Sequence, residues 1–159
     1  MVVDSDDIGT AMDITSLSWH VQYGTEVTLD GLQIFMGTCA NDELTEVFDD
    51  NFISGTRIKV YDRSTVTLTS SGPGSWLEVP LDRTFWYNGD DNLLMEFSWS
   101  SGSNSIYVWG WDPGLNQTLF GSYGASSGDL EKVSLHMRLN GALDLTATTF
   151  GAIKATLGN

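Results

Sequence analysis

Residues 92–100 read Asn-Leu-Leu-Met-Glu-Phe-Ser-Trp-Ser, and this stretch decides the class of fold. Its large apolar side chains Leu93, Met95, Phe97 and Trp99 fall on alternate positions. Successive side chains of a β-strand point to opposite faces, so a period of two predicts a strand with one buried face. We expect these four side chains in a core and the residues between them on the opposite face.

The same alternation recurs along most of the chain. Further runs of this kind occupy residues 17–23, 32–36, 58–60, 66–68, 106–111, 118–123 and 134–139. Turn-forming residues separate the runs, among them Asp30-Gly31, Asn88-Gly89-Asp90 and Asn140-Gly141. Short strands at this spacing are typical of an antiparallel sandwich or barrel. We therefore predict an all-β fold of about eight to ten strands.

One internal segment has helical spacing instead. Residues 41–48 begin with Asn41, a residue type that caps helices, and carry acidic residues in the first turn. Leu44, Val47 and Phe48 then recur at a helical period. The pattern predicts a short helical turn near residues 41–48, packed on the end of the sandwich.

The C-terminal residues form a second helical pattern. Phe150, Ile153 and Leu157 fall on one helical face, and Gly158 follows them. A helix this short is not stable by itself in water. It must therefore dock on the rest of the protein or fray. We accordingly divide the chain into a β-sandwich over residues 1–145 and a tail over residues 146–159. One expectation for the tail is a short helix that docks on the sandwich.

Acidic residues dominate the charge of this 159-residue chain. It has 21 Asp and Glu against 7 Lys and Arg, a net charge of −14. A phosphate backbone requires a basic patch, which so few scattered cations do not form. We expect no nucleic-acid partner, and no membrane insertion because no apolar run approaches about 18 residues. The acidic balance favours an exported or salt-exposed protein.

Several short motifs together resemble a known family. They are Ile8-Gly9, Ile14-Thr15-Ser16-Leu17, residues 32–38, Val60-Tyr61-Asp62, residues 76–82, residues 85–94 and His136-Met137-Arg138-Leu139. In order and spacing they resemble a jelly-roll module of large secreted proteins from Bacteroidetes-type and related environmental bacteria. The resemblance covers about residues 8–140. It implies an antiparallel two-sheet jelly-roll sandwich, an extracellular or cell-surface setting and an accessory role, and it transfers no catalytic residue.

Carboxylates gather in segments that we expect to be loops. Calcium takes six to eight hard oxygen ligands, which acidic loops and their backbone carbonyls supply. Jelly-roll modules often hold a structural calcium, and by this analogy we consider one here. The candidate ligands are Asp4, Asp6, Asp7, Asp49 and Asp50; the alternative is that these side chains are simply solvated.

Tyr107, Trp109 and Trp111 form the richest aromatic motif, because all three share one face of a predicted strand. Ile106 and Val108 share the other face. If the aliphatic pair faces the core, the aromatic row is exposed, and an exposed apolar patch marks a contact surface. Exposed aromatic rings also stack on sugars. The alternative is a core filled by the aromatic row.

Motifs for catalysis are weak. Residues 124–128 match the G-x-S-x-G nucleophile pattern, but they stand between β patterns, whereas a nucleophile elbow leads from a strand into a helix. His20 and His136 have no metal-ligand spacing in the sequence. We therefore expect that the protein is not an enzyme.

Two functions remain as hypotheses. The first is an extracellular non-catalytic accessory or adhesion module that binds a glycan, a surface or a partner protein through Tyr107, Trp109 and Trp111. The alternative is a structural subunit that assembles with copies of itself into a filament or layer, because a sheet edge can accept a neighbour's strand.

Overall fold

The computed structural model describes residues 1–143, and it is all-β with antiparallel sheets, as the sequence predicted. The predicted tail over residues 146–159 lies outside the described residues. The elements in chain order are β1 (Val2–Val3), α1 (Ser5–Ile8), β2 (Met12–Tyr23), β3 (Glu26–Cys39), η1 (Phe48–Asn51), β4 (Ile58–Thr69), β5 (Trp76–Tyr87), β6 (Asn92–Ser98), β7 (Ser101–Asn104), β8 (Tyr107–Val108), β9 (Gly110–Trp111), β10 (Thr118–Phe120), β11 (Asp129–Glu131), β12 (Ser134–Leu135) and β13 (Met137–Leu143).

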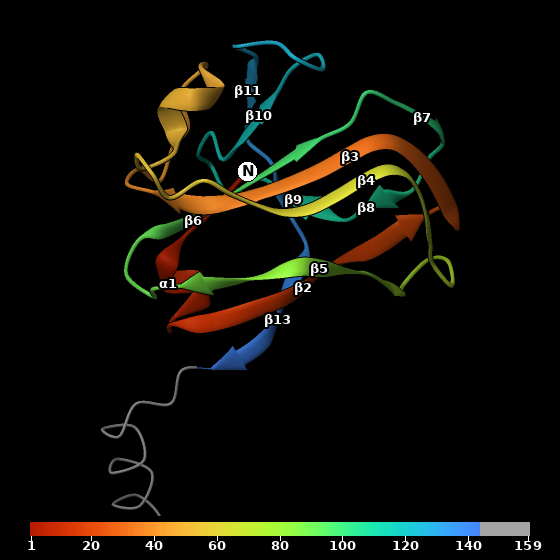
Figure 1. Cartoon of the computed structure of the whole chain (residues 1–159), viewed down its shortest axis with the longest axis horizontal. Coiled ribbons are helices and arrows are strands. Elements are labelled where there is room, and N and C mark those ends of the chain that lie inside the picture. Colours follow the sequence, from red (N-terminus) through yellow and green to blue (C-terminus); the bar gives the residue numbers. More distant parts are fainter. Residues whose placement is uncertain (144–159) are drawn as a thin grey trace, which may run out of the picture.

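Two main sheets form the body of the molecule (Figure 1). The five-stranded sheet has the order β1-β6-β3-β4, and β7 also pairs with β3. The four-stranded sheet has the order β13-β2-β5, and β8 also pairs with β2. Two short pairs, β10 with β11 and β9 with β12, complete the strands. The inner face of each sheet packs against the other sheet. The jelly-roll connectivity expected from the sequence stays a prediction.

The core lies between the two inner faces. Its fully buried side chains come from both sheets, for example Ile34 and Met95 from the five-stranded sheet and Leu17 and Val79 from the four-stranded one. In β6, Leu93 and Met95 are buried in this core, and Phe97 packs against it, which confirms the alternation read from the sequence. Trp99 does not follow them: it lies beyond the end of β6 and is 47% exposed.

A second apolar cluster covers the outer face of the five-stranded sheet. Leu94 points away from the main core and is buried with Val2, Cys39 and Leu44. Three half-buried side chains pack against this cluster: Phe52, which follows η1, Leu119 of β10 and Leu130 of β11. In Figure 1 the η1 segment and the β10–β11 pair lie on the side of β3 and β6 away from β2 and β5. The outer face of the four-stranded sheet has no such cluster among residues 1–143.

The helical turn predicted near residues 41–48 is wrong in place and type. Residues 41–47 are not helical, and a 3-10 helix begins only at Phe48. The side-chain oxygen of the buried Asn51 accepts from the backbone N–H of Thr45, and its side-chain nitrogen donates to the carbonyls of Thr45 and Val47. Leu44 donates its N–H to the carbonyl of Asn116. These contacts occupy the backbone groups that a helix would have paired.

The one α-helix in the described residues, α1, was not predicted. Asp4 caps its start by accepting from the N–H of Asp6, and Gly9 ends it with a left-handed backbone at φ 75°. Such caps satisfy backbone groups at helix ends, which stabilises even a single turn.

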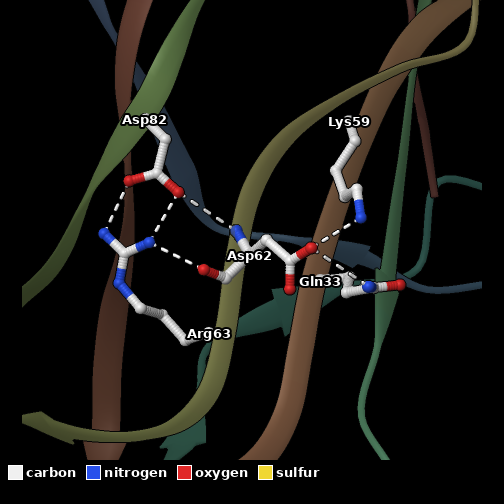
Figure 2. A network of polar contacts seen from close by, with 5 residues as sticks. All are labelled: Gln33, Lys59, Asp62, Arg63 and Asp82. Carbon is white, nitrogen blue, oxygen red and sulfur yellow. Dashed lines mark hydrogen bonds and ion pairs between the residues drawn. The ribbon is translucent and has the colours of Figure 1, made fainter.

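A polar network joins the two sheets at one edge, where β4 faces β5 (Figure 2). The Arg63 guanidinium of β4 donates two hydrogen bonds to the Asp82 carboxylate of β5, at 2.5 and 2.6 Å. Asp82 also accepts from the backbone N–H of Asp62, whose own carboxylate contacts Lys59 and Gln33. The hydrogen bond from Arg63 lowers the pKa of Asp82 below its ordinary value, and the one from Lys59 lowers that of Asp62.

The placement of β6 predicts how its side chains contribute to stability. Replacing the fully buried Met95 by alanine removes core contacts and leaves a cavity, so Met95→Ala should lower the free energy of unfolding by about 2–5 kcal/mol. Urea denaturation followed by circular dichroism measures this.

Trp86→Ala is the matched control for that experiment, because Trp86 is 57% exposed. An exposed substitution should change the free energy of unfolding by about 0.5 kcal/mol or less. Equal losses in the two variants would contradict the assignment of Met95 to the core.

Candidate functional site

The predicted aromatic row lies on the surface. Tyr107, Trp109 and Trp111 are 59%, 46% and 49% exposed. Val108, between the first two, packs against the main core. Because neighbouring residues of an extended chain point to opposite sides, the aromatic side chains face outward. Of the two arrangements that the sequence left open, the structure has the exposed one.

Backbone pairing brings this row beside the two histidines. β8 continues the four-stranded sheet by pairing with the end of β2. The N–H of Trp109 then donates to the carbonyl of His20, and the N–H of His136 donates to the carbonyl of Trp109. His20 also donates its N–H to the carbonyl of His136, so three segments of the chain meet here. β9 leads onward to pair with β12.

Aromatic side chains are in mutual contact at this junction. The ring of His20 stacks on Trp76, with centroids 5.0 Å apart and planes 22° apart. His136 meets His20, Trp76 and Trp111 edge-on, with centroids at 4.9, 5.3 and 6.4 Å. We call the set on the outer side of the four-stranded sheet the aromatic face: His20, Trp76, Tyr107, Trp109, Trp111 and His136.

Polar side chains adjoin the aromatic face on the same side of the sheet. The Arg138 guanidinium lies 3.6 Å from the centre of the Trp76 ring, a cation–π contact. The Asn140 side-chain nitrogen donates to the hydroxyls of Ser16 and Ser18, and Ser16 donates to the Glu78 carboxylate. Both serines are buried beneath these neighbours. The hydrogen bonds hold the polar groups in one arrangement, so this surface is ordered before any ligand arrives.

The aromatic face ends in a shallow groove at the far end of β2. Tyr23 and Tyr107 lie across from one another there, with ring centroids 6.3 Å apart. Glu26, Asn104 and Ser105 contribute the polar part of the lining. The groove thus continues the aromatic row with hydrogen-bonding groups beside it.

A separate cleft with apolar and polar lining opens at the sandwich edge opposite the Arg63–Asp82 network. Its volume is about 360 Å³, and it lies where β13 faces β1 and α1. Val3, Ile8, Met137 and Leu139 line it, and all four are only half-buried. Trp111 stands at this cleft as well as on the aromatic face. β13 and β1 are the end strands of their sheets. Among residues 1–143, no strand pairs with the outer edge of β13, whereas on β1 the N–H of Val2 donates to the carbonyl of Gln117.

The candidate calcium ligands fall in two separate elements. Asp4, Asp6 and Asp7 belong to the start of α1, whereas Asp49 and Asp50 belong to η1. Asp4 already caps α1, and Asp49 lies 3.6 Å from the Arg57 guanidinium. Within residues 1–143, no group of three or more His, Cys, Asp or Glu side chains is placed to hold a metal ion.

Asp4 instead lies near other carboxylates that surround a buried tyrosine. Burial raises the pKa of the Tyr87 phenol, and the carboxylates of Asp91, Asp4 and Asp90 raise it further. The phenol donates its hydrogen bond to the carbonyl of Asp91. The acidic segment at α1 is thus a neighbour of the β5–β6 turn.

The calcium site stays a prediction that a melting experiment decides. A bound ion stabilises the folded state by mass action, by about 2.7 kcal/mol at a hundredfold excess over Kd. If Asp4 or Asp49 helps to hold calcium, excess Ca²⁺ should raise Tm, and Asp4→Asn or Asp49→Asn should remove that rise. A melting curve that is the same with Ca²⁺ and with a chelator would contradict the site.

The G-x-S-x-G match forms a turn. Residues 124–128 connect β10 to β11, and the carbonyl of Ser126 accepts from the N–H of Phe48. A strand follows this turn, whereas a nucleophile elbow needs a helix at that point. The match therefore carries no argument for hydrolysis.

Sequence reasoning singled out three residues of the aromatic face but missed its centre. His20 alternates with the apolar Trp19 and Val21, which does indicate an outward side chain. What the sequence does not show is that β2 and β13 pair, which places His20 beside His136 although 116 positions separate them. Arg138 joins the site through the same pairing, and Trp76 joins it through the pairing of β2 with β5, which places it opposite His20.

No protein-family model, curated protein or solved structure matches this chain. In the part of the chain that the structure describes, no helix is long and apolar enough to cross a membrane.

Proposed function

We propose that the protein is a non-catalytic binding module whose aromatic face takes a glycan. The observation that supports this most is the exposure of Tyr107, Trp109 and Trp111 in one row on an ordered sheet surface. Large exposed aromatic groups carry a cost in solubility, so a contiguous set of them marks a contact surface. An extracellular or cell-surface location and an accessory role in adhesion belong to this same proposal.

The chemistry of the face suits a sugar ring. The axial C–H groups of a pyranose meet the electron-rich face of an indole or phenol ring. Ring hydroxyls need donors and acceptors beside that stacking contact. Arg138 adjoins the aromatic face at Trp76, and Asn104 and Glu26 line the groove beside Tyr107. Sugar sites combine flat apolar contact with a few placed polar groups, as other small-ligand sites do.

The charge of the chain narrows the class of glycan. A net charge of −14 repels polyanions such as uronate-rich polymers. We therefore propose a neutral polysaccharide as the ligand. A partner protein, the other ligand that such a patch serves, is an outcome that the following experiment would favour if no polysaccharide binds.

Affinity gel electrophoresis with soluble neutral polysaccharides tests the proposal; a suitable panel is a mixed-linkage β-glucan, a xyloglucan, a galactomannan and an arabinoxylan. At least one should retard the wild-type chain. Trp109→Ala and Trp111→Ala should each weaken that binding about tenfold or more, as expected for an aromatic anchor at the centre of a contact.

Trp86→Ala is again the matched control, since Trp86 lies on β5 opposite Asp13, at the other end of the sheet from the His20–Trp76 pair. Its binding should equal that of the wild type. Failure of every polysaccharide to bind, or an equal loss in Trp86→Ala and Trp109→Ala, would overturn the assignment.

The open edge supports a second candidate function, assembly with copies of the same chain. We propose here that β13 of one copy lies along the cleft edge of another. Within residues 1–143 no strand pairs with the outer edge of β13, so its backbone groups offer hydrogen bonds there. The half-buried Met137 and Leu139 offer apolar surface that a second copy would cover. Self-complementary pairing of one edge would give a symmetric dimer, and use of different edges would give a filament.

Light scattering over a range of micromolar concentrations tests this assembly. The wild-type chain should give masses at multiples of 17.4 kDa, and Leu139→Asp should shift the mass toward the monomer because it places a charge in the cleft. Phe120→Asp, an exposed position on β10 outside the cleft, is the control and should still assemble. A wild-type chain that stays monomeric at every concentration would contradict this function.

A further inference from the structure

We propose that His20 and His136 form a binding site for one divalent transition-metal ion of the zinc, nickel or copper class. The proposal does not rest on glycan binding, because stacking of a sugar on the aromatic rings does not require the imidazole Nδ1 atoms. It starts from one distance: the Nδ1 atoms of the two imidazoles lie 3.2 Å apart.

That separation is close to what a shared metal ion requires. Zinc binds imidazole nitrogen at about 2.0–2.1 Å in a tetrahedral arrangement, which places two ligand nitrogens about 3.3 Å from each other. The two ring planes are 85° apart, so the rings do not stack and each can turn its nitrogen toward a common point. For both Nδ1 atoms to bind one ion, the ring that now donates must carry its proton on Nε2, so that each Nδ1 presents a lone pair to the metal.

The protein holds the two rings in place. The backbones are joined directly by the hydrogen bond from the N–H of His20 to the carbonyl of His136, at 2.9 Å. Trp109 bridges the same two residues with two further backbone hydrogen bonds. The stacking of His20 on Trp76 fixes one ring, and the edge contact of His136 with Trp76 restrains the other. Little freedom is lost when an ion binds, so affinity rises accordingly.

The donor set selects the class of ion. Neutral imidazole suits zinc, copper and nickel, whereas calcium and magnesium require oxygen ligands. Glu78, a carboxylate on the same face, is already hydrogen-bonded to Ser16. Two protein ligands leave the remaining coordination positions to water, since the described residues offer no third His, Cys, Asp or Glu ligand. The nearby Arg138 cation opposes binding, so we expect micromolar rather than nanomolar affinity.

The untagged full-length chain, titrated with NiCl₂ and ZnCl₂ by calorimetry, tests the site. We expect one ion per chain with a micromolar dissociation constant. Trp76 serves as an internal reporter, because its ring lies 5.0 and 5.3 Å from the two imidazole rings, and bound Ni²⁺ should quench its fluorescence.

Histidine variants distinguish binding of the metal ion at this site from its general binding to the 21 acidic side chains. His20→Gln and His136→Gln should each raise the dissociation constant at least tenfold. Asp129→Asn, which removes an exposed carboxylate on β11, should leave it unchanged. Ni²⁺ or Zn²⁺ binding that is equal in the wild type and in both histidine variants would overturn the proposal, as would the absence of any binding to the wild type.

A measurement on the unaltered chain covers the case in which a variant fails to fold. The chain has two histidines, so its imidazole C–H signals in the NMR spectrum belong to His20 and His136 alone. Paramagnetic Ni²⁺ at one equivalent should broaden the signals of both rings together. Broadening of only one ring, or of neither, would overturn the shared site.

Discussion

The face-to-face packing of the two sheets determines where every other feature lies. Ile34 and Met95 of one sheet and Leu17 and Val79 of the other are fully buried against one another, and most of the remaining core residues gather around them. Burial of apolar surface is the dominant favourable term in folding, and these strands can provide it in only one orientation. Once the inner faces are fixed, the alternate residues of each strand must face outward.

The outer faces of the two sheets differ in how far other segments of residues 1–143 cover them. On the five-stranded sheet, Leu94 continues into a second apolar cluster, which the η1 segment and the β10–β11 pair cover. On the four-stranded sheet, the outward residues include the half-buried His20 and Trp76, which lie beside the exposed Trp109 and Trp111. The edges differ in the same way: Arg63 and Asp82 join one edge, whereas the other opens into the cleft beside β13. The candidate ligand surface and the candidate assembly surface therefore occupy parts of the sandwich that residues 1–143 leave uncovered.

Much of the fold could be predicted from the sequence because the deciding signal is local. The period of two in residues 92–98 places Leu93 and Met95 correctly, and the same reasoning gives the outward direction of Trp109 once Val108 is known to pack against the core. The error over residues 41–48 arose because a local helical pattern competes with tertiary contacts. The side chain of Asn51 takes the backbone groups of that segment, and no periodicity reveals such a contact.

The centre of the candidate site could not be predicted for a related reason. His20 and His136 become neighbours only through the register of β2 with β13, and the shift at Asn140 and Gly141 changes that register within the strand pair. Alternation assigns a residue to a face but does not say which distant strand lies beside it. Which residues lie side by side on neighbouring strands is therefore known only from the structure.

The outward position of the aromatic face is the condition for ligand binding there, and fluorine NMR of the chain labelled with 5-fluorotryptophan measures it directly. A soluble paramagnetic agent broadens the signal of each indole according to its exposure to solvent. We expect strong broadening for Trp109 and Trp111, comparable with that of Trp86, and weak broadening for Trp19, which is 8% exposed. Signals of Trp109 and Trp111 as protected as that of Trp19 would place the row inside the sandwich and rule out the aromatic face as a contact surface.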